Sequence, residues 1–208
     1  MPQEQPFESG GVRGILHVPE NANGDGLALT HGAGSNCNAP LLVSLARAFC
    51  ESGMVVLRYD LPFRVLRASG SPSPSGQARD REGVAAAVAE VRKLAPRRVF
   101  AGGSSYGGRQ TAMIAAERPG LADGLLLLSY PLHPPGKPEQ LRTAYFPQWS
   151  TPALFVHGTR DPFGTIEELR AAIAAIPVRV DVLEVPSAGH DLRQAARMGE
   201  DILARMLF

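Results

Sequence analysis

The chain has 208 residues, 44% of them hydrophobic, which is enough apolar material for the core of one ordinary domain spanning residues 1–208. Its formal net charge is +1, and basic and acidic residues are mixed along the chain rather than gathered into blocks. No concentrated basic stripe is available to neutralise phosphates, so the composition argues against a nucleic-acid partner.

The first ten residues are polar and contain no apolar segment of the kind that a signal peptide needs. The longest apolar runs are well short of a membrane span, so no membrane partner is expected. Two cysteines, Cys37 and Cys50, do not suggest a disulfide framework. Together these features predict a reduced, cytoplasmic setting.

Short apolar runs alternate with segments of helical pattern along the chain. Strands are predicted at residues 12–18, 27–30, 54–59, from 99 up to the serine at 105, and at 124–130, 153–157 and 178–185. Helices are predicted at residues 40–51, 77–94, 106–117, 165–176 and 191–206, with a loop at 60–76 and a proline-rich insert at 131–150. This alternation predicts an α/β fold: a doubly wound, mostly parallel sheet of about seven strands, with helices on both faces and no cap domain.

A glycine-flanked serine lies between a predicted strand and a predicted helix. The segment Gly103–Gly107 matches the pattern G-x-S-x-G, with Ser105 at its centre. This order is typical of a nucleophile elbow, in which a tight turn lifts the serine hydroxyl clear of the sheet, so Ser105 is the predicted nucleophile. The alternative is a glycine-rich loop that binds a phosphate at the helix N-terminus.

A serine nucleophile needs a general base, and three histidines follow Ser105 in the chain. His190 is the predicted base, because it follows the last predicted strand and would overhang the carboxyl edge of the sheet, where ligands bind. His157 lies at a strand end, where packing or a structural hydrogen bond is expected, and His133 lies in the insert. The alternative for His190 is a capping or packing role at a helix N-terminus.

Asp161 is the predicted acid that would orient His190 and stabilise its imidazolium form. It lies in the loop after the strand that precedes the His190 strand. Asp123 precedes a strand and would face the opposite end of the sheet, while Asp181 lies inside a strand. An Asp-Pro pair before a helix is also a common turn and cap, and that role remains the alternative for Asp161.

Two backbone N–H groups are needed to stabilise the oxyanion that forms when the serine attacks. One is predicted at Tyr106, the residue after the nucleophile. The second is predicted at Ala33, in the glycine-rich segment 31–34 that follows the second strand, with Gly34 as the alternative.

Several aromatic and basic side chains near these loops are candidates for a substrate pocket. The predicted pocket residues are Phe63, Tyr130, His133 and Trp149. The aromatic residues of the insert would equally serve to pack it onto the domain. Three arginines around the 60–76 loop would either bind an anionic substrate group or form a solvated, salt-bridged surface: Arg58, Arg64 and Arg67.

Four segments of the chain resemble the α/β-hydrolase superfamily: Leu29–Gly34, Gly103–Gly108, Gly158–Asp161 and Gly189–Asp191. The resemblance extends over nearly the whole chain and is nearest to the small, cap-less, dienelactone-hydrolase-like branch. Within it, the chain is similar to a subgroup that includes a testis-expressed hydrolase-like protein and a chromatin-complex subunit. The resemblance implies a Ser-His-Asp hydrolase of ester, thioester or related acyl bonds. Dienelactone hydrolases have a cysteine in place of Ser105, so their substrate is not implied.

The predicted function is therefore hydrolysis of a small acyl substrate through an acyl-enzyme on Ser105. No His, Cys, Asp or Glu cluster has metal-ligand spacing, and no P-loop or dinucleotide pattern follows the glycines at 102–103, so no metal and no cofactor are predicted. Two alternatives remain open. One is a non-catalytic, hydrolase-like binding or assembly module, and the other is acyl transfer to an acceptor other than water.

Overall fold

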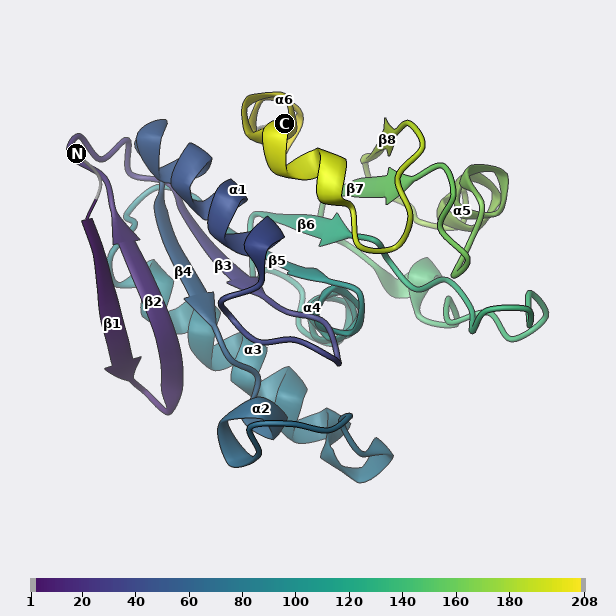
Figure 1. The fold of residues 1–208 in the computed structure, drawn as a ribbon, viewed down its shortest axis with the longest axis horizontal. Coiled ribbons are helices and arrows are strands. Elements are labelled where there is room, and N and C mark those ends of the chain that lie inside the picture. Colours follow the sequence, from purple (N-terminus) through teal and green to yellow (C-terminus); the bar gives the residue numbers. More distant parts are fainter. Residues whose placement is uncertain (1–2, 207–208) are drawn as a thin grey trace.

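The computed structural model describes residues 3–206, whose strands form one eight-stranded sheet with helices packed on both faces (Figure 1). The strands are β1 (Gln3–Ser9), β2 (Val12–Val18), β3 (Gly26–Thr30), β4 (Val55–Tyr59), β5 (Val99–Ser104), β6 (Gly124–Leu128), β7 (Ala153–Gly158) and β8 (Val180–Val185). Their order in the sheet is β1-β2-β4-β3-β5-β6-β7-β8. The β1–β2 and β2–β4 pairs are antiparallel and the other five pairs are parallel, so the predicted doubly wound, mostly parallel α/β fold is confirmed.

The helices form two layers. One face of the sheet carries α1 (Pro40–Glu51), the 3₁₀ helix η3 (Arg193–Arg197) and α6 (Gly199–Met206), and the other carries α3 (Gln77–Arg92), α4 (Tyr106–Glu117) and α5 (Ile166–Ile173). Three short helices lie in loops: α2 (Pro62–Leu66), η1 (Pro74–Gly76) and η2 (Phe146–Gln148). No helix of residues 3–206 combines the length and the apolar character needed to cross a bilayer.

The central strands β3, β4, β6 and β7 are buried throughout and mostly apolar, because both faces of the sheet are covered. In β6, Leu125 and Leu127 point to the core under α3, α4 and α5, whereas Leu126 and Leu128 point to the core under α1 and α6. Successive side chains of a strand point to opposite faces, so a run of leucines supplies both cores at once. All four leucines are fully buried.

The structure differs from the sequence-based expectation at three places. The polar N-terminal segment forms an eighth strand, β1, which pairs with β2 at the sheet edge and leaves most of its side chains exposed. The predicted 60–76 loop contains α2 and η1, each too short to show a helical period. The predicted helix 191–206 is divided into η3 and α6, and both parts pack against α1.

Candidate active site

Three loops at the carboxyl edge of the sheet bring Ser105, Asp161 and His190 together. Ser105 follows β5, Asp161 follows β7 and His190 follows β8. The Oγ atom of Ser105 lies 2.8 Å from Nε2 of His190, and Nδ1 of His190 lies 2.8 Å from Oδ2 of Asp161. The side chains predicted to form the triad are thus within hydrogen-bond distance of one another.

The direction of these hydrogen bonds follows from the chemistry of the acceptors. An ionised carboxylate can only accept, so Nδ1 of His190 carries the hydrogen that is donated to Asp161. Nε2 is then free to accept the hydroxyl proton of Ser105, which is the arrangement needed for a general base. Asp161 is only 5% exposed and also accepts the backbone N–H of Phe163. The Phe163 ring stacks on His190, with 4.1 Å between ring centroids, and restricts the imidazole further.

The backbone at Ser105 is held in a sparsely populated conformation. Its φ is +50° and its ψ is −114°, which for a residue other than glycine costs on the order of 1–3 kcal/mol. The Ser105 N–H donates to the Leu128 carbonyl at 2.8 Å, and the Ser105 carbonyl accepts from the backbone N–H of Arg109 at 2.9 Å. These two bonds hold the peptide groups before and after Ser105 in place. The turn also needs a glycine at 103, where a Cβ atom would lie 2.7 Å from the carbonyl carbon of Gly107.

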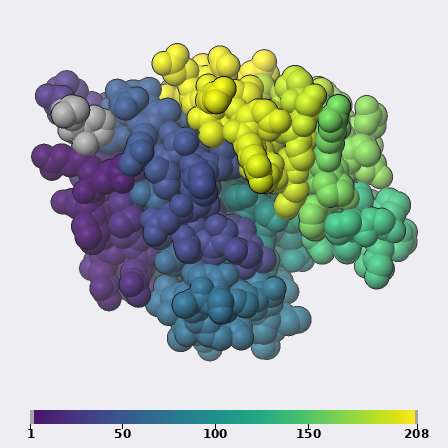
Figure 2. Space-filling view, in the orientation of Figure 1, coloured from purple at the N-terminus to yellow at the C-terminus, as the bar shows by residue number. Residues whose placement is uncertain are grey.

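A cavity of about 640 Å³ opens beside Ser105 and His190. Most of its other lining residues are apolar or glycine: Gly32, Ala33, Gly34, Ala39, Pro40, Leu41, Leu42, Phe163 and Ala196. Asp191 and Arg193, which form an ion pair at 2.6 Å, are largely exposed members of the lining. The cavity lies on the face of the molecule where α1 packs beside η3 and α6, drawn in blue and yellow in Figure 2. In residues 3–206 no group of three or more His, Cys, Asp or Glu side chains is placed to hold a metal ion.

The predicted oxyanion donors both lie near Ser105, since Tyr106 follows it in the chain and Ala33 lines the same cavity. Tyr106 is the first residue of α4, so its N–H has no acceptor within the helix. Ala33 and Gly34 line the cavity, and within residues 3–206 neither of their N–H groups has a protein acceptor. A Cβ atom built on Gly32 would lie 3.5 Å from Cβ of Ser105, which shows how closely this loop approaches the serine.

The structure does not bring the four predicted pocket residues to this cavity, and the expectation is corrected as follows. Tyr130 and Trp149 are fully buried in the other core, where the Tyr130 hydroxyl donates to the Arg142 carbonyl and the Trp149 indole donates to the Thr151 carbonyl. They pack the 131–150 insert against the sheet and α4, the alternative use of these aromatic residues.

His133 and Phe63 also lie outside the cavity lining. His133 is 4% exposed and contacts the Pro134 carbonyl and the Glu168 carboxylate, which together raise the pKa of His133. Phe63 packs behind the predicted oxyanion donors, against His31 and Tyr106. Both residues lie in loops that follow strands at the carboxyl edge of the sheet, but neither side chain lines the cavity beside Ser105.

The sequence interpretation missed the role of two arginines and of Phe163. Arg58 and Arg64 are 2% and 8% exposed, and both donate to backbone carbonyls of the segment between β3 and α1. They form neither of the surfaces expected for them. Phe163 stacks on the His190 ring, and its position two residues after the predicted acid is a sequence signal for this role.

Comparison with known proteins agrees with this architecture. A family model described as an alpha/beta hydrolase domain matches residues 24–206. A dienelactone hydrolase from Anabaena variabilis ATCC 29413 superposes with a TM-score of 0.75 at 20% identity, over 100% of this chain and 99% of that chain. A serine hydrolase without lid from Xanthomonas campestris gives 0.72 at 18% identity, over 100% and 96%. An alpha-beta serine hydrolase homologue from Coxiella burnetii gives 0.75 at 18% identity, over 98% and 97%.

At these identities the solved structures establish a shared fold, which includes lidless and dienelactone-hydrolase members. The family model covers most of the chain, including all three residues of the hydrogen-bonded Ser-His-Asp set. The chain belongs to the alpha/beta hydrolase domain family.

Proposed function

We propose that this protein is a serine hydrolase that cleaves an ester, thioester or related acyl bond of a small substrate. The observation that carries the proposal is the continuous hydrogen-bond chain from Ser105 through His190 to Asp161, at the wall of an apolar cavity. Family membership supports hydrolysis in general. The position of the three hydrogen-bonded side chains at the wall of the cavity supports a mechanism through an acyl-enzyme.

In the proposed reaction the Ser105 oxygen attacks the acyl carbon while His190 Nε2 takes the hydroxyl proton. The backbone N–H groups of Tyr106 and Ala33 would stabilise the oxyanion of the tetrahedral intermediate. His190 returns the proton to the leaving alcohol or thiol, which departs and leaves an acyl group on Ser105. A water molecule, deprotonated by His190, attacks the acyl group and releases a carboxylic acid, and Ser105 recovers its proton.

The cavity lining supports a neutral, apolar acyl group as the part of the substrate bound next to Ser105. Ala39, Leu41, Leu42 and Ala196 offer contact area but no charge, so a charged acyl chain would lose its hydration there without a partner. The charged pair Asp191 and Arg193 lies exposed, where it remains in water.

Neither cysteine competes with Ser105 as the proposed nucleophile. Cys37 and Cys50 are buried free thiols, and burial raises the pKa of each to about 11. At neutral pH both are protonated, and a thiol reacts far more slowly than a thiolate. Two free thiols accord with the proposed cytoplasmic location. The single sheet formed by residues 3–206 supports our proposal of one domain spanning the chain.

The proposal is tested by labelling with a fluorophosphonate probe and by hydrolysis of p-nitrophenyl butyrate, comparing the native protein with Ser105→Ala. We expect stoichiometric labelling of the native protein and a loss of kcat on the order of 10⁶-fold in the variant, because the nucleophile is removed. Ser71→Ala, in the exposed 67–73 segment, serves as the matched control and should retain full labelling.

Two results would contradict the proposal. If the folded native protein neither labels nor hydrolyses the ester, the chain is a hydrolase-like module without this activity. If Ser105→Ala retains labelling, the reactive residue is elsewhere. Circular dichroism of both variants verifies that the comparison is made on folded protein.

A further inference from the structure

Arg64 is a buried arginine that the proposed mechanism does not use. It belongs to α2, in the segment that follows β4, and is 8% exposed. Within residues 3–206 it forms no ion pair with a carboxylate. A guanidinium that has lost most of its water and has no counter-charge is costly unless its N–H groups find acceptors.

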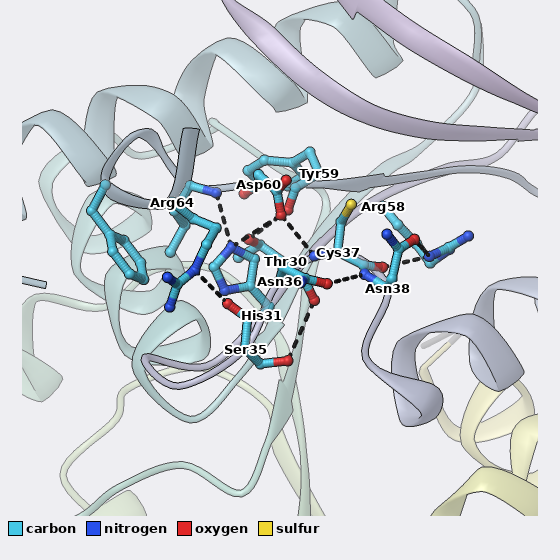
Figure 3. A network of polar contacts seen from close by, with 12 residues as sticks. Thr30, His31, Ser35, Asn36, Cys37, Asn38, Arg58, Tyr59, Asp60 and Arg64 are labelled. Carbon is cyan, nitrogen blue, oxygen red and sulfur yellow. Dashed lines mark hydrogen bonds and ion pairs between the residues drawn. The ribbon is translucent and has the colours of Figure 1, made fainter. Parts of the chain in front are cut away.

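Its acceptors are backbone carbonyls of two different loops, and Figure 3 shows Arg64 beside one of them, Ser35. Nε donates to the Ser35 carbonyl at 2.8 Å, and Nη2 donates to the Ala33 carbonyl at 2.9 Å. Further bonds reach the Gly70 carbonyl at 3.1 Å and the Arg67 carbonyl at 3.3 Å. Arginine suits this task because its planar fork holds several donors in fixed directions.

The hydrogen bond from Arg64 to the Ala33 carbonyl fixes the orientation of the whole peptide group between Ala33 and Gly34. A peptide group is planar and trans, so the carbonyl of Ala33 and the N–H of Gly34 point in opposite directions. Holding that carbonyl on Arg64 therefore sets the orientation of the next N–H, which belongs to a cavity-lining residue. A second anchor lies one peptide earlier, where the Gly32 carbonyl accepts from Nδ1 of His31 at 2.8 Å.

The same α2 segment also reaches the other proposed oxyanion donor. The Arg64 guanidinium lies 4.9 Å from the ring centroid of Phe63, and that ring packs edge-on against Tyr106 at 5.7 Å. Asp80 accepts the Phe63 N–H and the Tyr106 hydroxyl, which fixes this contact. The α2 segment thus contacts both donor regions: Arg64 binds the Ala33 carbonyl, and Phe63 packs against the Tyr106 ring.

We propose that Arg64 is a positioning residue that holds the loop 32–35. Through the Ala33 carbonyl it orients the N–H of Gly34, the alternative donor, and keeps the adjoining peptide with the N–H of Ala33, the proposed donor, facing the oxyanion. It acts through the carbonyls of Ala33 and Ser35 and does not itself touch the substrate. This inference rests on the serine-hydrolase function proposed above. It assigns to Arg64 a contribution to the transition state, beyond its contribution to folding.

The test is the kinetics of Arg64→Ala and Arg64→Lys with p-nitrophenyl butyrate, with kcat expressed per fluorophosphonate-reactive site so that unfolded protein is not counted. We expect kcat of Arg64→Ala to fall about 100-fold while KM changes by less than about threefold, because the loss of one oxyanion donor affects the transition state. Arg64→Lys keeps a charge but not the fork, so its kcat should remain at least about tenfold below that of the native protein. Arg67→Ala, an exposed arginine of the same segment, is the matched control and should keep the native kcat.

Chemical rescue separates positioning from folding. Arg64 borders two surface hollows, one beside Gly70 and one beside Asp60, so a small cation can reach the space that its side chain leaves. Millimolar guanidinium should raise kcat of Arg64→Ala at least about fivefold, whereas ammonium at the same concentration should not, because only guanidinium restores the planar donors.

The possible failures are distinguishable. A native protein without Ser105-dependent turnover overturns the proposed function and this inference with it. With native turnover present, an unchanged kcat per site in Arg64→Ala overturns the inference alone. The inference alone is also overturned if the loss of kcat is proportional to the loss of thermal stability and guanidinium does not reverse it.

Discussion

Asp161 shows how a single side chain settles the chemistry of its neighbour. Its carboxylate accepts from Nδ1 of His190, and this fixes Nε2 as the nitrogen that faces Ser105. Its own orientation is fixed by the Phe163 N–H, which donates to Oδ1 at 2.9 Å. With the acid 5% exposed, little water competes for these contacts. Asp161 was predicted from its place after a strand, but its burial and its bond to Phe163 depend on the folded loop.

Asp161→Asn should lower kcat for ester hydrolysis by roughly 10³- to 10⁴-fold while leaving the protein folded. An amide keeps an oxygen for the Phe163 N–H, but it no longer favours the His190 tautomer that accepts the serine proton. Steady-state kinetics with circular dichroism measure both effects. Asp181→Asn, a partly exposed residue of β8 outside the site, is the control and should behave as the native protein. A loss of less than tenfold in Asp161→Asn would remove this residue from the proposed triad.

The strand-turn-helix unit from β5 to α4 was predicted almost as it occurs. The predicted helix 106–117 agrees with α4, and the turn holds Ser105 at a positive φ. Glycine-rich turns and helix periods are local signals, so they can be read without knowing what packs against them. In contrast, α2 has five residues and no capping side chain, so no periodic signal marks it. Its position depends on Asp80 of α3, which accepts the Phe63 N–H.

Gly103→Ala should destabilise the protein by roughly 1–3 kcal/mol and reduce its activity, because the added methyl group forces the strand away from the helix. The methyl carbon would lie 2.7 Å from backbone atoms of Gly107 and Gly108. Urea denaturation gives the free energy of unfolding. Gly189→Ala is the stability control, since a Cβ at 189 meets no atom within 4 Å. Equal stabilities for the two variants would show that the elbow tolerates a wider turn.

At the scale of the whole molecule, the sheet edge collects loops that are distant in sequence. Ser105 and His190 are 85 residues apart and Asp161 and His190 are 29 apart, yet they form one hydrogen-bonded set. Parallel strands make this possible because their carboxyl ends point the same way. The same packing buries histidines elsewhere, and burial changes their titration. His17 in β2 is fully buried, with Arg58 donating to its Nε2 at 2.8 Å.

The free energy of unfolding should fall as the pH is lowered from about 6.5 to about 4. Burial, aided by the charge of Arg58, lowers the pKa of His17 to about 4, and burial also lowers the pKa of His31. In the unfolded chain a histidine titrates near 6.5, so in this pH range the unfolded state binds protons that the native state does not. The loss due to His17 is at most about 3 kcal/mol.

His17→Gln tests this pH dependence, since glutamine offers an acceptor to Arg58 but does not titrate. Urea unfolding at pH 7.5 and at pH 4.5 should show a smaller loss of stability in the variant than in the native protein. The contributions of carboxylates that do not contact His17 cancel in the comparison. Glu4, whose carboxylate lies 4.0 Å from His17 Nδ1, is replaced by Gln in both proteins. An identical loss in both would mean that His17 is protonated in the fold.

The sequence by itself determined the α/β class and the main alternation of strands and helices, without β1, α2, η1 or the division of the last helix. It also identified Ser105, Asp161 and His190 as the candidate triad. These follow from local patterns and from the rule that ligand sites lie at strand carboxyl ends. Only the tertiary structure decided which side chains surround the serine. It placed Leu41 and Ala196 in the cavity, Tyr130 and Trp149 in the opposite core, and the Arg64 guanidinium against the carbonyls of the loop 32–35. The reason is physical: a loop has no period that reveals its direction, and its side chains take their places only when neighbouring elements supply partners for their polar groups.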